Sequence, residues 1–416
     1  MKRRTFLSAS MALGLASVFK PVSVLAADAL SVLLPPWVTL PKEMTDKYTA
    51  KTGGVLDIQT LGWDEIRTKI VTSMVANTAP ASATEMDWSW VGQFGSAGWY
   101  DDLSGILSAE LKADLPTTAI FTFDGKLIGV PYNNDYRVMI YNTAHLKAAG
   151  IAAAPKTPDE MLAAARAIKG KGVATYPIGL PLSASEGSAT AWYLLTKAFG
   201  GDLFDADFKP LFTDKESAGY KAMEFEVAAL KEGLIDPAAT SLKDVEIQEL
   251  FKSGKISFDV AGWAGNLAVY SDASKSQVSA DVAAALIPNV AGASRTIGLP
   301  GALGVPVSAK DKETAHAFIN WMLDAETMVD NYVKLGNLPT RLSVLKQLND
   351  EGKLKQGDVL IAQAAVVEPL FAQGTPGWYP EFSGAVATAL NAAAKGQISV
   401  ADAVAQIAQV AAEAQQ

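Results

Sequence analysis

Tryptophan is the residue type in this chain whose number and positions point most clearly to a binding chemistry. The sequence has nine tryptophans. A tryptophan face packs on the C–H surface of a sugar ring, while nearby carboxylates, amides and guanidinium groups bind the hydroxyls. Trp263 follows Gly262 directly after the apolar segment 256–261, which we expect to be a strand. Because α/β sheets place ligands beyond strand ends, Trp263 is the first candidate for a ligand contact.

Two more tryptophans, Trp88 and Trp90, flank Ser89 at the end of the predicted strand 84–88. Side chains alternate along a strand, so both tryptophans point to one face and Ser89 points to the other. We expect one of the two to contact a ligand. Packing in the core is the competing explanation for any tryptophan.

Two further tryptophans lie in predicted loops. Trp37 follows Pro35 and Pro36 after the first predicted strand, and Trp378 lies in a Gly-Trp-Tyr-Pro turn. Loops carry binding residues more often than core elements do, so both are candidates. We expect the core to hold three others: Trp99, Trp192 and Trp321.

Polar candidates cluster near segment 133–135, which reads Asn-Asn-Asp and follows the apolar segment 128–132. Asn134 and Asp135 bring an amide and a carboxylate that suit vicinal hydroxyls, or they form an ordinary polar turn. Arg341 offers a planar fork of donors to ligand oxygens, or it pairs with a surface carboxylate. Gly301 belongs to a glycine-rich segment, 298–304, that would allow close backbone approach or hinge rotation.

Asp64 is a weaker candidate. It stands beside Trp63 at the start of a predicted helix. A carboxylate there also interacts favourably with the helix dipole, which explains the residue without any ligand.

Catalytic and metal-binding patterns are missing from the sequence. It has no cysteine, no Gly-x-Ser-x-Gly elbow and no phosphate-binding loop. His145 and His316 are the only histidines, and they lie far apart in predicted helices. A pair of carboxylates could still act as a glycosidase acid and base, but no such pair stands out. We therefore expect no catalytic residues, no metal and no cofactor.

The amino terminus reads as an export signal. Lys2, Arg3 and Arg4 precede a short apolar run, and small residues end the segment near Ala26. Residues 1–26 are therefore a predicted signal peptide, and the Arg-Arg-Thr-Phe-Leu run is similar to twin-arginine signals, although ordinary secretory signals also carry paired basic residues. The rest of the chain has no apolar run near the roughly 20 residues that a membrane-spanning helix needs.

Length and charge limit the partners. Of 416 residues, 390 follow residue 26, which is more than one hydrophobic core usually organises, so two domains are expected. The chain carries 35 basic and 44 acidic residues, a net charge of −9, and loss of the basic signal peptide makes it more negative. Nucleic acid and anionic membranes are then poor partners.

Strand-like and helix-like segments alternate along the chain. Segments 30–34, 55–60, 84–88 and 128–132 resemble strands, and residues 63–76 and 157–169 resemble helices. The carboxyl-terminal third is mostly helical and rich in alanine. This alternation predicts an α/β fold with helices on the faces of its sheets.

Several sequence blocks, in order, resemble the carbohydrate-type extracellular solute-binding proteins, the group that includes maltose-binding protein. Together they extend over nearly the whole chain after the signal peptide. The blocks are 63–66, 87–90, 129–135, 139–142, 149–160, 251–263, 315–323, 336–341 and 378–404.

The resemblance implies a two-lobed periplasmic binding protein fold with discontinuous lobes joined by hinge crossings. We expect lobe 1 to contain residues 27–134 and 302–338, and lobe 2 to contain residues 138–298 and 341–416. The hinges are expected near 134–137, 298–302 and 338–341. A ligand would bind between the lobes, and closure would follow from contacts that only the closed form makes.

The resemblance also implies a function. The expected protein is a monomeric periplasmic carrier that delivers a sugar, polyol or related polar solute to the permease of an ABC importer. An acidic residue near the first crossing would bind the sugar, which favours Asp135. If the solute is an anionic sugar derivative, the candidate cations are Arg137, Arg295 and Arg341. A ligand-sensing subunit for a receptor and a carbohydrate-active enzyme are the alternatives.

Overall fold

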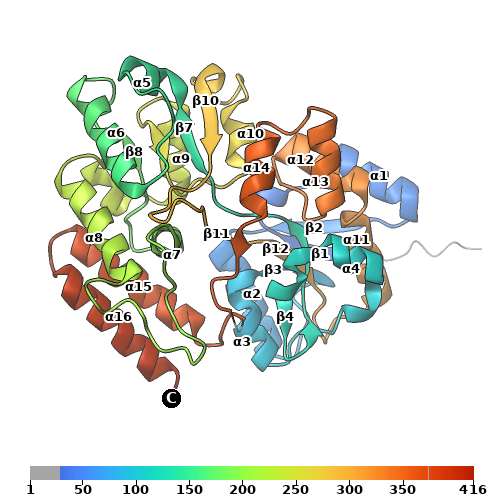
Figure 1. Cartoon of the computed structure of the whole chain (residues 1–416). Coiled ribbons are helices and arrows are strands. Elements are labelled where there is room, and N and C mark those ends of the chain that lie inside the picture. The colour runs from blue at the N-terminus through green and yellow to red at the C-terminus, as the bar shows by residue number, and fades with distance from the viewer. Residues whose placement is uncertain (1–28, 373) are drawn as a thin grey trace, which may run out of the picture.

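The computed structural model describes residues 29–372 and 374–416 and shows two α/β lobes side by side (Figure 1). The predicted signal peptide, 1–26, lies outside the described residues. Within those residues, none of the helices is long and apolar enough to cross a bilayer.

The first lobe is built on a five-stranded sheet in the order β2-β1-β3-β12-β6. β1 is parallel to β2 and β3, whereas β12 is antiparallel to β3 and β6. Helices cover the sheet, so strands such as β1 are buried and apolar on both faces. The strands and helices of this lobe are β1 (Leu30–Leu34), β2 (Leu56–Thr60), β3 (Ala83–Asp87), β6 (Val130–Asn133), β12 (Gly301–Gly304), α1 (Lys42–Thr52), α2 (Trp63–Val75), α3 (Val91–Ser96), α4 (Ala109–Asp114), α11 (Lys312–Met322) and α12 (Ala325–Leu335).

The second lobe is built on a four-stranded sheet in the order β10-β7-β9-β8. Its helix α7 is enclosed, with every residue from Ser188 to Ala198 buried; α15 packs beside α7, and α16 packs on α15 and α8. Figure 1 shows these two carboxyl-terminal helices in red on this lobe. The strands and helices are β7 (Met139–Asn142), β8 (Ile178–Gly179), β9 (Phe258–Asp259), β10 (Val282–Ala285), α5 (Thr143–Ala148), α6 (Pro158–Gly170), α7 (Glu186–Ala198), α8 (Ala218–Lys231), α9 (Asp244–Lys252), α10 (Asn266–Tyr270), α15 (Tyr379–Ala394) and α16 (Val400–Ala414).

The three segments that we expected to cross between the lobes lie against one another. The Asn134 N–H donates to the Leu338 carbonyl at 2.9 Å, and the Leu299 N–H donates to the Asp135 carbonyl at 2.7 Å. The Thr340 hydroxyl donates to the Pro131 carbonyl at 2.8 Å. The boundaries of the lobes and the role of these segments as hinges stay predictions.

The segment between residue 342 and α15 adds a strand pairing that was not predicted. Helices α13 (Leu342–Asp350) and α14 (Gly357–Ala364) lead to β13 (Val367–Glu368), which pairs with β11 (Thr296–Ile297) before the chain reaches α15. Glu368 accepts hydrogen bonds from Arg295 and from the buried Lys197 side chain of α7. These hydrogen bonds between charged side chains hold β13 against the second lobe.

Most predicted elements are confirmed, and the exceptions have local causes. The helix predicted from residue 157 is α6, where Thr157 caps the Glu160 N–H at 3.1 Å and Pro158 occupies the first turn. The prediction that the chain stays extended through Trp88 and Trp90 is wrong. Asp87 accepts the Ser89 N–H at 2.9 Å, so residues 88–90 form a 3₁₀ turn and side-chain alternation does not apply. The strand predicted over 256–261 is reduced to β9.

One carboxyl group in the second lobe is buried without a partner. Glu226, on α8, has no exposed surface, and neither carboxylate oxygen has a hydrogen-bond partner. Burial raises its pKa well above the ordinary value, because the charged form loses its hydration. The neutral acid is therefore the stable form within the folded lobe.

We predict that Glu226→Met raises the free energy of unfolding at pH 8 by about 1–3 kcal/mol, since it removes an unpaired buried polar group. When folding raises the pKa of an acid, the contribution of that group to the free energy of unfolding is complete below about pH 4.3. This contribution is lost as the pH rises through the pKa of the folded state. The gain from Glu226→Met should therefore be larger at pH 8 than at pH 5 in urea titrations. Glu224→Met, at an exposed position on the same helix, is the control. A gain that does not grow with pH would contradict this account.

Candidate ligand-binding site

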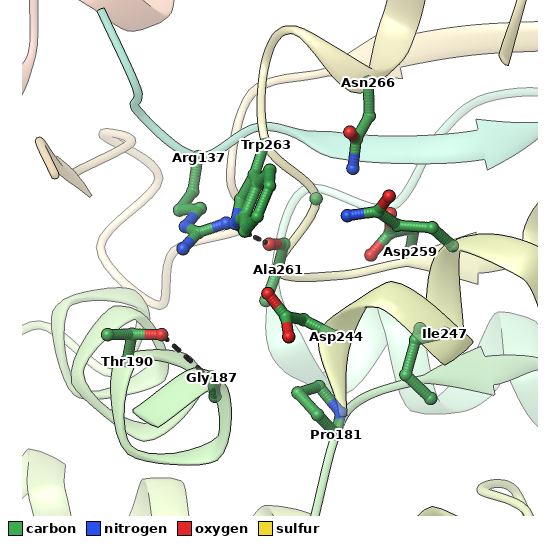
Figure 2. Close-up of a pocket in the computed structure, with 12 residues that line it drawn as sticks. Arg137, Pro181, Gly187, Thr190, Asp244, Ile247, Asp259, Ala261, Trp263 and Asn266 are labelled. Carbon is green, nitrogen blue, oxygen red and sulfur yellow. Dashed lines mark hydrogen bonds between the residues drawn. The ribbon is translucent and has the colours of Figure 1, made fainter. Parts of the chain in front are cut away.

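A pocket opens in the second lobe beside the first crossing segment. It encloses about 320 Å³ of space free of protein atoms, with open solvent included. The first crossing, the start of α7, the start of α9 and the loop after β9 all contribute to it (Figure 2). The lining residues are Arg137, Pro181, Gly187, Thr190, Asp244, Ile247, Gln248, Asp259, Ala261, Gly262, Trp263 and Asn266.

Arg137 and Trp263 form one wall. Their backbones make an antiparallel bridge, and the Arg137 guanidinium carbon lies 5.1 Å from the centre of the Trp263 ring (Figure 2). Arg137 Nη1 also donates to the Ala261 carbonyl at 3.3 Å. The chain turns sharply before Trp263 because Gly262 has no Cβ, which would lie 2.9 Å from an Asp259 carboxylate oxygen. Trp263 is half-buried, so part of its ring stays accessible.

Carboxylates form the opposite side. Asp259, at the end of β9, is only 4% exposed and accepts a hydrogen bond from the Tyr270 hydroxyl at 2.8 Å. Burial raises its pKa to about 6, although the Tyr270 hydrogen bond and Arg137 act in the other direction. Asp244, the first residue of α9, directs its carboxylate into the same space (Figure 2). Asn266 donates to Tyr270 at 3.3 Å and completes a polar network.

Asp135 connects this pocket to the first lobe. Burial raises the pKa of Asp135 to about 6, Arg137 lowers it, and Asp87 and Asp244 raise it. Asp87 ends β3 in the first lobe, whereas Asp244 belongs to the second. The carboxylates of both lobes are therefore close enough to affect one another.

The lobes also touch directly beside the pocket. The Trp88 ring of the first lobe lies 4.9 Å from the Tyr379 ring of the second. The Tyr379 and Ser383 hydroxyls donate to Glu186, the first residue of α7. Burial raises the pKa of Glu186 to about 7, these hydrogen bonds lower it, and Asp87 and Asp64 raise it. Asp64, exposed at the start of α2, thus faces the second lobe.

Of the predicted site residues, Trp263 lines the pocket and Asp135 lies next to it. Trp88 and Trp90, at the end of the predicted strand 84–88, are both buried. Trp88 packs on Tyr379, and Trp90 packs between Trp63 and Phe94 with ring centres 5.2 and 5.7 Å away. The indole N–H of Trp90 has no hydrogen-bond partner.

Two of the remaining predicted residues have structural partners instead. Arg341 forms an ion pair with Asp114 at 2.8 Å and also donates to the Leu323 carbonyl. Gly301 is buried in β12, where a Cβ would lie 2.7 Å from a carboxylate oxygen of Glu85. The close approach there is to the protein's own side chain.

Three predicted residues lie apart from the pocket lining. Trp378 packs in an aromatic cluster that includes Phe204 and Phe382. Trp37 is 37% exposed, and its carbonyl accepts from Asn337 at 3.0 Å. Asn134 is buried at the first crossing, and its side-chain oxygen has no hydrogen-bond partner.

The candidates for binding an anionic ligand also separate. Arg295 pairs with Asp202 and Glu368, and Arg341 pairs with Asp114, so both are committed to the protein. Arg137 alone among the three lines the pocket. Within the described residues, no group of three or more histidines and carboxylates is arranged to hold a metal ion.

Sequence reasoning missed Asp244, Asp259, Thr190 and Glu186. One signal was available: Asp259 interrupts the apolar segment 256–261, and a carboxylate inside a buried strand often has a specific partner. The others lie at helix starts or inside a helix, where their residue types are unremarkable. Only the fold brings them to one pocket.

Comparison with known proteins agrees with this architecture. Residues 38–329 match the family described as bacterial extracellular solute-binding protein. A putative binding protein of Brucella abortus is 24% identical over 340 residues, which cover 81% of this chain and 80% of the relative. A probable amino-acid ABC transporter periplasmic-binding protein of Sinorhizobium fredii is 26% identical and covers 72% of this chain and 69% of the relative.

Solved structures share the fold at low identity. A solute-binding protein of Thermotoga lettingae, bound with α-D-tagatose, superposes with a TM-score of 0.83 at 21% identity and covers 94% of this chain and all of its own. A maltose-bound MalE3 of T. maritima gives 0.82 at 19% identity, covering 92% of this chain and 99% of its own. The two-lobed architecture and the family match together establish that this chain belongs to the bacterial extracellular solute-binding proteins.

Proposed function

We propose that this protein is the periplasmic binding component of an ABC importer and that it takes a sugar, a polyol or a closely related solute into the pocket beside the first crossing. The observation that carries the proposal is the pairing of the partly accessible Trp263 side chain with the carboxylates of Asp244 and Asp259 in one pocket. An aromatic face suits the C–H side of a sugar or polyol, and carboxylates accept hydrogen bonds from its hydroxyls.

Relatives support this ligand class. Among proteins that share the fold, one carries tagatose, one carries maltose, and one from Agrobacterium vitis carries D-mannitol. The Sinorhizobium fredii relative is named for amino acids, and this leaves amino acids as the competing ligand class.

The proposed mechanism is closure on the ligand. Asp87, Asp64 and Trp63 belong to the first lobe, whereas Trp263, Asp244 and Asp259 belong to the second. A solute that contacts both groups favours the closed form, since only that form makes both sets of contacts. The closed form would present the surface recognised by the permease, and the solute would leave chemically unchanged. A sensor subunit would use the same binding step, so the experiments below test binding itself.

The first prediction is that a solute from a panel of sugars, polyols and amino acids binds with one-to-one stoichiometry and raises the melting temperature. Binding at 100 times the dissociation constant stabilises the native state by about 2.7 kcal/mol. Thermal shift would identify the solute, calorimetry would give stoichiometry, and mass spectrometry would show it unaltered after incubation. An amino acid as the sole binder, or products that accumulate with protein concentration, would overturn the proposal.

The second prediction is that Trp263→Ala weakens binding at least about tenfold and leaves the apo protein folded, since truncating a central aromatic contact costs about 2 kcal/mol. Calorimetric affinity and an apo melting curve would be measured together. Trp321→Ala is the control, because Trp321 is buried against Tyr48 and its loss should destabilise the fold by about 3–5 kcal/mol. Wild-type affinity in the Trp263 variant would show that the ligand lies elsewhere.

A further inference from the structure

The charge of the pocket is strongly unbalanced. Arg137 is the one basic residue among the residues that line it, whereas Asp244 and Asp259 line it and Asp135 lies beside it. Across the interface, Asp87 acts on Asp135 and on Glu186. Carboxylates therefore outnumber the single guanidinium in and beside the pocket.

The charge of Arg137 is already offset by the protein. Arg137 lowers the pKa of both Asp135 and Asp259, so its positive charge is felt by two carboxylates. Its guanidinium also lies over the Trp263 ring, 5.1 Å from the centre. Asp244 and Asp87 both raise the pKa of Asp135, and Arg137 is the cation that lowers it.

Two charged side chains that line the pocket are nine-tenths or more buried. Arg137 is 6% exposed, and its guanidinium donates to a single acceptor, the Ala261 carbonyl. Asp259 is 4% exposed, and its Oδ2 accepts a hydrogen bond from Tyr270. The guanidinium makes one of the several hydrogen bonds that it can donate, so it keeps donors for polar atoms of a solute.

Aromatic faces add to the attraction for a cation. Trp263 is half-buried in the second lobe, and Trp63, at the start of α2 in the first lobe, is half-buried beside Trp90. The face of an indole attracts ammonium groups as well as sugar C–H groups.

We infer that the solute carries a positively charged amine on a hydroxylated carbon skeleton, as in an amino sugar or an amino polyol. The inference rests on the proposed function and narrows its ligand class. Asp244 and Asp135 would hold the ammonium group, while Arg137, Thr190 and Asn266 would meet hydroxyl and ring oxygens. An acidic sugar would face uncompensated carboxylates and would be excluded.

The test uses matched ligands that differ in one substituent. Each series contains a neutral sugar, its 2-amino derivative and its uronic acid, for example glucose, glucosamine and glucuronate, and covers the common hexoses together with polyols and amino polyols. Calorimetry at 20 mM and 500 mM NaCl gives affinities for the intact protein. We expect the amino member of the binding series to bind at least about tenfold more tightly than the neutral member at low salt, with the ratio falling at high salt.

A variant links the preference to the named residues. Asp244→Asn should reduce the ratio of amino to neutral affinity by about fivefold or more while leaving the apo melting temperature near that of the wild type. Asp57→Asn is the matched control, because Asp57 is exposed on β2, the edge strand farthest from the first crossing in the sheet order, and it should leave the ratio unchanged.

The outcomes separate this inference from the proposed function. Equal or tighter binding of a neutral or acidic member overturns the inference that the ligand is positively charged, and it leaves the sugar or polyol proposal standing. Retention of the full preference in Asp244→Asn also overturns the inference. Absence of binding by every member of every series overturns the proposed function itself.

Discussion

Burial of the Arg137 guanidinium against the second lobe, at the first crossing, is the interaction on which the site depends. A buried cation is costly unless carboxylates and hydrogen bonds compensate it. The compensation here comes from Asp135 on the same crossing, from Asp259 at the end of β9, and from the ring and carbonyl of the segment 261–263. Arg137 therefore fixes the crossing strand, the β9 loop and the Trp263 ring in one arrangement.

The same arrangement explains why the pKa values of so many carboxyl groups are raised near the lobe interface. Asp135, Asp259 and Glu186 are each removed from water by residues of other elements, and each raised pKa has desolvation as its largest cause. Groups whose pKa is shifted by burial and by specific neighbours commonly mark functional sites. In this protein they mark the surface where the lobes meet, and a bound solute would replace the lost water.

Local patterns predicted the elements well, and they predicted the site only in part. Buried strands and capped helices announce themselves over a few residues, so β1 and α6 could be identified directly. Trp263 was found because a strand end in an α/β sheet is a general ligand position. For Arg341, donation to a ligand and pairing with a carboxylate were both left open, because its partner, Asp114, lies 227 residues away and gives no local signal. Trp88 and Trp90 were misplaced because one hydrogen bond from Ser89 to Asp87 turns the chain out of the strand.

If a solute is held by both lobes at once, its binding changes the distance between the lobes. The sequence has no cysteine, so Val75→Cys on α2 and Leu211→Cys in the second lobe, both exposed, give two unique spin-labelling sites. Pulsed electron paramagnetic resonance would compare the distance distribution without and with the solute identified by thermal shift. The account predicts that saturating solute shifts the population to a single narrow distance. An unchanged distribution in a sample that calorimetry shows to be fully bound would contradict it.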